Sequence, residues 1–145
     1  TKDKTPVLGM LERGGNLITT VVPNTQKSIV QPIVFENVKA GINVYNDEWK
    51  AYNGLNKTFK HKKVYHAANL FVNAMASTNS LDGFWSHFKR GVDGIYHWVS
   101  KDHLQSYVDE FTLRYNTRNM TTQERFEIVL VSANGERLTY QELTK

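Results

Sequence analysis

Four large apolar residues in the segment 77–90 recur with the period of a helix. They occupy positions i, i+3, i+4 and i+7 and are Leu81, Phe84, Trp85 and Phe88. Side chains at this spacing form one stripe along a helix, and such a stripe is buried when the helix packs on a core. The pattern therefore predicts a helix that buries Phe84 and Trp85 instead of presenting them for stacking.

A polar row lies along another edge of the same predicted helix. Asp82 and Lys89 are seven residues apart, with a rise of about 10 Å between them, and Asn79 precedes Asp82 by nearly one turn. Such a row can hold a metal ion at one end and a phosphate at the other. The same residues also fit an ordinary solvated face, and Asp82 fits a charge near a helix start that the helix dipole favours.

The residues at the start of the chain predict a β-hairpin. Strands are expected at residues 6–13 and 16–22, where apolar and β-branched residues are frequent. Gly14-Gly15 between them indicates a two-residue turn, since both residues can adopt positive φ.

A helix is expected to follow the hairpin and to end near residue 37. Thr25 or Ser28 can cap it, and Pro32 predicts a kink or a late start. The side chains expected to face inward are Val30, Ile33, Val34 and Val38.

A short strand is expected at residues 42–45, with Ile42 and Val44 on one face. Asp47 follows it, and strand ends that face the loops are where open α/β sheets place their ligands. From position alone, Asp47 equally fits a cap for a helix that starts at Glu48.

The remaining elements are a strand, a loop and a run of helices. The strand is expected at residues 63–66 and is followed by a loop at residues 67–78. Ser100 is expected to cap a helix at residues 101–117, and a last helix is expected at residues 122–131. The order of elements predicts one α/β (α+β) domain over residues 1–145, a mixed β-sheet with helices packed on it.

Composition excludes several classes of protein. A chain of 145 residues with 40% apolar residues and no cysteine is a folded domain without disulfides or thiolate metal sites. It suits a reducing cytoplasm, and no apolar run approaches the length of a membrane span. The net charge of +4 is compatible with a polyanionic partner.

Residues 78–91 read T-N-S-L-D-G-F-W-S-H-F-K-R-G, which matches the pattern T-N-x-x-E-G-F-W-S-x-x-K-R-G except for Asp at the Glu position. With this segment, the chain resembles the catalytic domain of bacterial insertion-sequence transposases of the DDE type, which have the RNase H-like fold of retroviral integrases. Further matching segments occur in the same order, at residues 4–9, 12–15, 45–49, 97–100 and 111–118.

The resemblance implies roles for individual residues. The family holds two divalent ions, Mg²⁺ or Mn²⁺, with two Asp and a third residue that is usually Glu, and a lysine follows two turns later. Carried over to this chain, the second Asp is Asp47, the third ligand is Asp82 or Asn79, and the lysine is Lys89. The implied activity is hydrolysis at transposon ends and strand transfer into target DNA.

A second set of residues is expected to contact DNA. Its members are basic side chains in the matching segments and in the lysine-rich stretch before residue 64. They are Lys57, Lys60, Lys62, Lys63, Lys89, Arg90, Arg114 and Arg118. The alternative interpretation of the lysine-rich stretch is an exposed loop without a partner.

This chain departs from the family pattern at the first Asp. In the family that Asp lies on a central strand before the hairpin, and Asp3 is a poor substitute for it. We therefore expect a sheet that lacks its first central strand and a fragment that is inactive or nearly so alone. Three arrangements fit this gap: another chain fills it, which would give a homo-oligomer, the elements rearrange, or an upstream segment supplies the strand.

Two alternatives to a bacterial, cytoplasmic transposase domain remain open. The first is a non-catalytic DNA-binding or assembly module from a decayed or split transposase, which the missing Asp and the Asp82 substitution favour. The second is a general RNase H-like nuclease or resolvase, although the matching segments are those of the transposase branch.

Overall fold

The computed structural model describes residues 4–46, 50–63 and 75–133, with side chains for all of these except residues 61–63 and 75–79. The strands are β1 (Val7–Leu11), β2 (Leu17–Val21), β3 (Asn43–Asn46) and β4 (Lys60–Lys63). The α-helices are α1 (Lys27–Asn37), α2 (Met75–Gly91), α3 (Leu104–Asn116) and α4 (Thr122–Ala133). Short 3₁₀ turns η1 (Lys50–Tyr52) and η2 (Leu55–Lys57) precede β4, and a π-helical turn η3 (Val92–Tyr96) follows α2.

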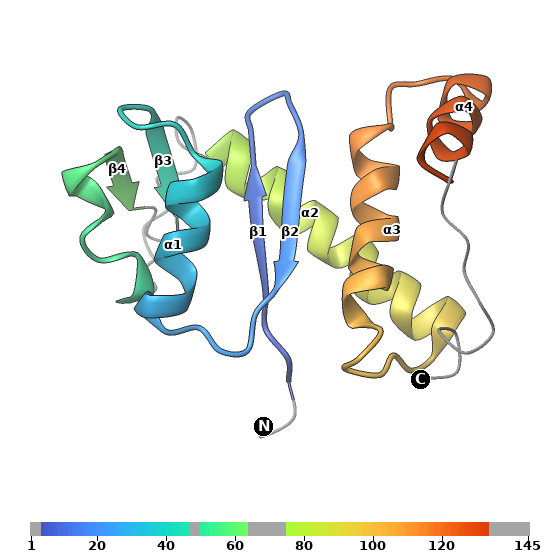
Figure 1. Ribbon diagram of the computed structural model, residues 1–145, viewed down its shortest axis with the longest axis horizontal. Coiled ribbons are helices and arrows are strands. Elements are labelled where there is room, and N and C mark those ends of the chain that lie inside the picture. The colour runs from blue at the N-terminus through green and yellow to red at the C-terminus, as the bar shows by residue number, and fades with distance from the viewer. Residues whose placement is uncertain (1–3, 47–49, 64–74, 134–145) are drawn as a thin grey trace.

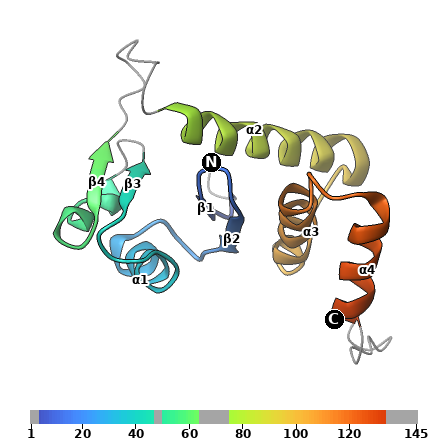
Figure 2. The same cartoon turned by 90° about the horizontal axis from the view of Figure 1, so that it is seen from above.

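The strands form two separate pairs within the described part of the chain. β1 and β2 are antiparallel, with Val7 opposite Val21 and Leu11 opposite Leu17, whereas β3 and β4 are parallel. Helix α1 lies on one side of the strands and α2 on the other (Figures 1 and 2). The expected mixture of strands and helices is confirmed, but the described strands form two small sheets and not one mixed sheet.

The hairpin turn is longer than the two-residue turn that the glycines indicate. The amide of Glu12 donates to the Asn16 carbonyl over 3.0 Å, and the amide of Gly15 donates to the Glu12 carbonyl over 3.0 Å. Only Gly14 of the two glycines has a positive φ, of 70°. The loop therefore spans the residues between Glu12 and Asn16.

The largest core cluster lies between the hairpin, α1 and the segment before β4. Its buried members are Leu8, Val22, Val30, Val34, Ala51, Leu55 and Phe59. The four side chains expected to face inward from α1 and its C-cap are all buried or partly buried against this cluster. Ile42, expected inside a strand, precedes β3 and is 48% exposed. Gln31 is also buried in this core, where its Nε2 donates to the carbonyls of Ala51 and Asn53 over 3.1 and 3.0 Å.

Helix α2 packs on the hairpin and on α3 through the apolar stripe. Phe84 and Phe88 are buried and form edge-to-face contacts with Tyr115 and Phe111 of α3, at ring-centroid distances of 5.8 and 5.3 Å. On the strand side, a Cβ on Gly9 would lie 2.8 Å from Cζ2 of Trp85, so only glycine permits this approach of α2. The expected burial of the stripe is thus confirmed for Phe84 and Phe88, whereas Leu81 and Trp85 are only half-buried.

Helix α3 covers the outer edge of β2 and bonds to its backbone (Figure 1). The Asn116 side-chain amide accepts from the Leu17 amide over 2.8 Å and donates to the Leu17 carbonyl over 2.9 Å. The Gln105 carbonyl oxygen accepts from the Val21 amide over 2.7 Å. These two side chains therefore satisfy backbone amides and a carbonyl on the outer edge of β2, which would otherwise be free to pair with a further strand.

The helix caps expected from the sequence are wrong. α1 begins at Lys27 with Gln26 at its N-cap, α3 begins at Leu104 with His103 at its N-cap, and neither cap residue makes a side-chain cap bond. Pro32 lies inside α1 and does not delay its start. Ser100, the expected cap of the later helix, has a buried hydroxyl without a hydrogen bond to any described residue.

Two element boundaries also differ from the expectation. β4 is Lys60–Lys63 and starts three residues before the expected strand at residues 63–66, of which only Lys63 lies within the described residues. Helix α2 begins at Met75, within the expected loop. Residues 64–74 and the apolar tail after Ala133 lie outside the described residues.

A hydrogen bond joins the connector after α2 to Glu110 of α3, and Glu110 also forms an ion pair within α3. The Tyr96 hydroxyl donates to Glu110 Oε2 over 2.6 Å, and Arg114 Nη2 donates to Glu110 Oε1 over 2.5 Å. The Tyr96 hydrogen bond first, and then Arg114, lower the pKa of Glu110 from its usual 4.5, and Glu110 raises the pKa of Tyr96.

We expect Asn116→Ala to destabilise the protein by about 1–3 kcal/mol, because it leaves the Leu17 amide and carbonyl without their partners. Urea unfolding would measure this loss. Asn119→Ala, which changes an exposed asparagine beyond α3, is the matched control and should change the free energy of unfolding little. Equal effects of the two substitutions would contradict the role of Asn116 at the β2 edge.

We expect Tyr96→Phe to lower the unfolding temperature at pH 6, and to lower it by less below pH 4. A carboxyl group with a lowered pKa in the folded state adds stability above its unfolded pKa, near 4.5 here, and this stability is lost as the pH falls through the folded pKa. Thermal unfolding at pH 6, 5, 4 and 3 tests this. Tyr107→Phe keeps the ring contact with Tyr96 and serves as the control. A Tyr96→Phe effect that is the same at every pH would contradict the assignment to Glu110.

Candidate functional site

The exposed edge of α2 carries the polar row expected from the sequence. Asp82 and Lys89 are both exposed, on the side of α2 away from buried Phe84 and Phe88. Seven helical residues separate Asp82 and Lys89, a rise of about 10 Å. Asn79 also lies in α2, but its side chain lies outside the described part of the structure.

One earlier interpretation of this row changes with the bounds of α2, and one further residue joins the row. Asp82 cannot be a helix-start charge, because α2 begins at Met75 and its first turn holds no acidic residue. Ser86, which sequence reasoning overlooked, is exposed one turn after Asp82 and lies on the same edge, between Asp82 and Lys89. The i, i+4, i+7 spacing of Asp82, Ser86 and Lys89 could have identified it.

Arg90 is exposed at the same end of α2. Its Nη2 lies 3.4 Å from Nδ1 of His87, one turn earlier. The last two turns of α2 therefore present Lys89 and Arg90 as cations near the helix C-terminus, where the helix dipole favours positive charge.

The strand side of the candidate site is described only up to Asn46. Asp47 follows Asn46 in the sequence and lies outside the described residues, as does Glu48, the residue whose helix it could cap. β3 contacts α2, so the strand that leads to Asp47 packs on the helix that carries Asp82. The hairpin turn also reaches β3, where the Arg13 guanidinium lies 5.5 Å from the centre of the Tyr45 ring. No local sequence pattern indicates this contact of Arg13.

The lysine-rich stretch forms strand β4 and the turn before it, so the alternative of an exposed loop holds only for its first part. Lys57 ends η2, and Lys60 begins β4 opposite Asn43 of β3. Both side chains are exposed. Lys62 and Lys63 lie in β4 as well, but their side chains are not described.

Arg114 is exposed on α3, and Arg118 is exposed just after the end of that helix. Arg114 pairs with Glu110, and the Arg118 guanidinium lies 4.2 Å from the centre of the Tyr115 ring. The structure therefore places Asp82, Lys89 and Arg90 on one helix, and Arg114 and Arg118 on and just after another.

The described residues include no group of three His, Asp or Glu side chains that could hold a metal ion. Asp82 supplies carboxylate oxygens, the ligand type that Mg²⁺ prefers. The one described carboxylate of the expected ligand set therefore has the right chemistry, but it is too few to hold an ion. No described helix is long and apolar enough to cross a membrane.

Comparison with known proteins gives a consistent result. The sequence model of the ISXO2-like transposase domain family matches residues 1–116. An uncharacterized transposase-like protein of Haemophilus influenzae is 31% identical over 106 residues, which cover 72% of this chain and 85% of that protein. A protein in the transposable element ISH50 of Halobacterium salinarum is 25% identical over 135 residues, 91% of this chain but only 46% of that protein. No solved structure matches the chain.

Proposed function

Because the chain belongs to the ISXO2-like transposase domain family, we propose that it acts in DNA transposition, by metal-dependent cleavage at transposon ends and strand transfer into target DNA. The observation that carries this proposal is the exposed Asp82–Lys89 edge of α2, on a helix that packs against the strand preceding Asp47. Family membership assigns DNA as the partner and a divalent cation as the cofactor.

The proposed ligands of the two cations are Asp47 and Asp82, with Asn79 as the alternative third ligand. Cations held there would stabilise the negative charge that develops on a phosphodiester during its cleavage. The separation of Asp47 and Asp82 by 35 residues suits the family, and Asp82 reaches less far than the usual Glu by one methylene group.

Lys89 is proposed to bind a backbone phosphate next to the scissile bond. It lies about 10 Å along α2 from Asp82, farther than one phosphate group extends. Lys89 therefore acts on the neighbouring DNA, as a point charge that orients the strand, and takes no part in metal binding. Arg90 adds a second charge at the same end of the helix.

We propose that the complete domain has the RNase H-like fold, with one more strand between β1 and β3. Its support is the pairing within the hairpin. Asn16 and Val22 bond across to Glu12 and Pro6, so the backbone groups of Val7, Gly9 and Leu11 point away from β2, towards the side of β3. A strand added there would bond to β1 and carry the remaining Asp.

Helix α4 is proposed to belong to the same domain, although the family match ends at residue 116. Arg125 in α4 donates from Nε to the Thr117 carbonyl over 2.9 Å and from Nη2 to the Arg118 carbonyl over 3.1 Å. These bonds satisfy carbonyls at the end of α3 and fix the start of α4.

A non-catalytic assembly module is the second candidate function. It is favoured by the Asp at the position of the usual Glu and by the absence of a three-ligand cluster from the described residues. Such a module would bind DNA without binding Mn²⁺ at the α2 edge.

We expect a Mn²⁺ anomalous peak beside Asp82 in crystals of the protein, and we expect it to disappear in Asp47→Asn and in Asp82→Asn. Asp93→Asn removes an exposed carboxylate in η3 and should leave the peak unchanged. A peak that survives both site substitutions, or no peak while DNA still binds, would favour the non-catalytic module.

We also expect the chain alone to cleave a labelled transposon end negligibly in Mn²⁺, since one carboxylate of the family set is not present. Gel analysis of the labelled DNA measures this. Turnover that is lost in Asp82→Asn would show that the site is complete without a further strand, and would contradict the expectation.

A further inference from the structure

Five exposed lysines lie on the α1 side of the molecule, away from the Asp82 edge of α2. They occur in α1, in the turn after it and in the segment that leads into β4, and they are Lys27, Lys39, Lys50, Lys57 and Lys60. We call this set the basic rim. Among these residues, the sequence predicts contact with DNA for Lys57 and Lys60 alone, through the lysine-rich stretch in which they lie.

Contacts between segments hold the rim lysines on one continuous surface. The Gly41 amide donates to the Thr58 carbonyl and the Lys60 amide to the Ile42 carbonyl, which places the turn of Lys39 beside the segment of Lys57 and Lys60. Gln31 binds α1 to Ala51 and Asn53, next to Lys50. Lys27 completes the surface, since a Cβ on Gly54 would lie 3.2 Å from its Nζ.

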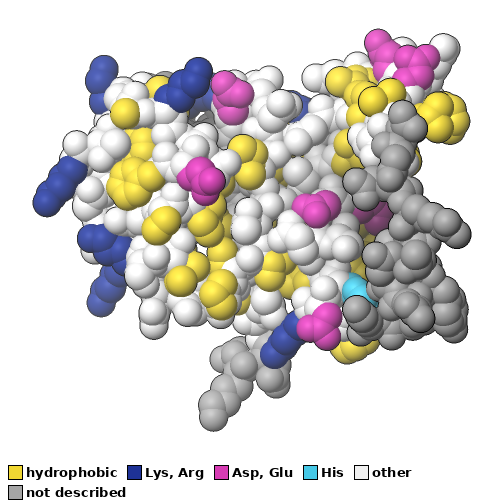
Figure 3. Space-filling model, in the orientation of Figure 1, with side chains coloured by type: hydrophobic (Ala, Val, Ile, Leu, Met, Phe, Trp, Pro, Cys, Tyr) yellow, Lys and Arg dark blue, Asp and Glu magenta, His cyan; other side chains and the backbone are white. Residues whose placement is uncertain are grey.

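The charge of this surface is one-sided. Among the described residues from Lys27 to Lys60, Glu36 is the only acidic side chain, and none of the five lysines takes part in an ion pair with a described residue. Helices α3 and α4 together carry four acidic and two basic side chains. Figure 3 shows Lys and Arg side chains along the edge over α1 and β4, and acidic side chains both inward of that edge and over α3 and α4.

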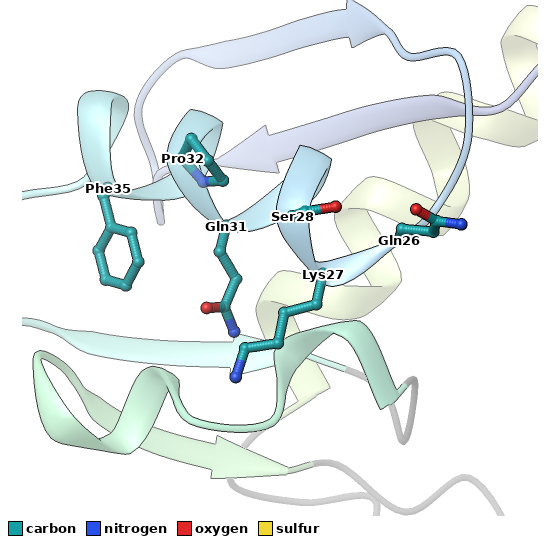
Figure 4. Close-up of a pocket in the computed structure, with 6 residues that line it drawn as sticks. All are labelled: Gln26, Lys27, Ser28, Gln31, Pro32 and Phe35. Carbon is teal, nitrogen blue, oxygen red and sulfur yellow. The ribbon is translucent and has the colours of Figure 1, made fainter.

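A hollow of about 620 Å³ adjoins the rim at the start of α1. Pro32 and Phe35 give it an apolar wall, and Gln26, Lys27 and Ser28 give it a polar margin (Figure 4). The ring of Phe35 stacks on buried Phe59, so the apolar wall is rigid and not a free loop. A backbone that follows the lysines can therefore lie against a fixed surface.

We propose that the basic rim binds the phosphate backbone of double-stranded DNA, at a stretch distinct from the one that reaches Asp82. Free lysine ammonium groups along one surface suit a polyphosphate because each can release a counterion from it. Helices α1 and α2 lie on opposite sides of the β1–β2 hairpin (Figure 2), so DNA along the α1 side of the rim lies away from α2. The rim therefore holds DNA outside the reacting end.

This inference rests on the proposed function for the identity of the polyanion, but its test does not. Binding of a 20-base-pair duplex of arbitrary sequence is measured by fluorescence anisotropy in EDTA, at salt concentrations from 50 to 200 mM. Without metal no cleavage enters the result, so a failed rim and a failed catalytic proposal give different observations.

The test compares two double variants of equal charge. Lys27→Gln with Lys50→Gln removes two rim lysines, and Lys4→Gln with Lys101→Gln removes two exposed lysines elsewhere. We expect the rim variant to bind roughly tenfold more weakly at 100 mM salt, and its slope of log K against log salt to fall by about 1.8, or about 0.9 per phosphate contact. The control variant should keep its slope.

Three results would overturn the inference. One is an equal loss in both variants, which would mean that only net charge matters, and another is no loss in either variant. The third is a rim-dependent loss with a 20-base-pair RNA duplex but not with DNA. Unfolding temperatures of both variants that match the unaltered protein would exclude misfolding as the cause.

Discussion

The arrangement of this domain depends on how α3 satisfies the outer edge of β2. A two-stranded hairpin is marginal in water by itself, because its outward amides and carbonyls have only water as partners. Asn116 pairs with both backbone groups of Leu17, as a neighbouring strand would, and Gln105 takes the Val21 amide. These bonds fix α3 along the strand.

The position of α3 in turn fixes α2. Phe111 and Tyr115 project from α3 onto Phe88 and Phe84, while the hairpin approaches Trp85 at Gly9. With that face of α2 held on two sides, its opposite edge faces solvent. The orientation of Asp82 and Lys89 is therefore a result of packing on the far side of the helix and needs no contact of their own.

Sequence reasoning succeeded where the signal was local. The stripe of Phe84 and Phe88 and the inward face of α1 follow from residue spacing, and the hairpin follows from Gly14-Gly15 between apolar segments. It failed where contacts between segments far apart in the sequence determine the structure. The partners Leu17 and Asn116 are 99 residues apart, and no pattern near either one indicates the other. The types of residue at the site were predictable through the resemblance, but Asp47 lies outside the described residues.

The two outermost strands are each protected against aggregation, by different means. Beyond β2, the side-chain amides of α3 occupy the positions that a foreign strand would need. β4, which pairs only with β3 among the described residues, is made entirely of Lys60, His61, Lys62 and Lys63, and lysines on an edge strand repel a second copy of the same strand. Among the described strands, the outer edges of β2 and β4 are thus unfavourable for the addition of a foreign strand. A strand that joins these two sheets is therefore expected at the edge of β1 that faces β3.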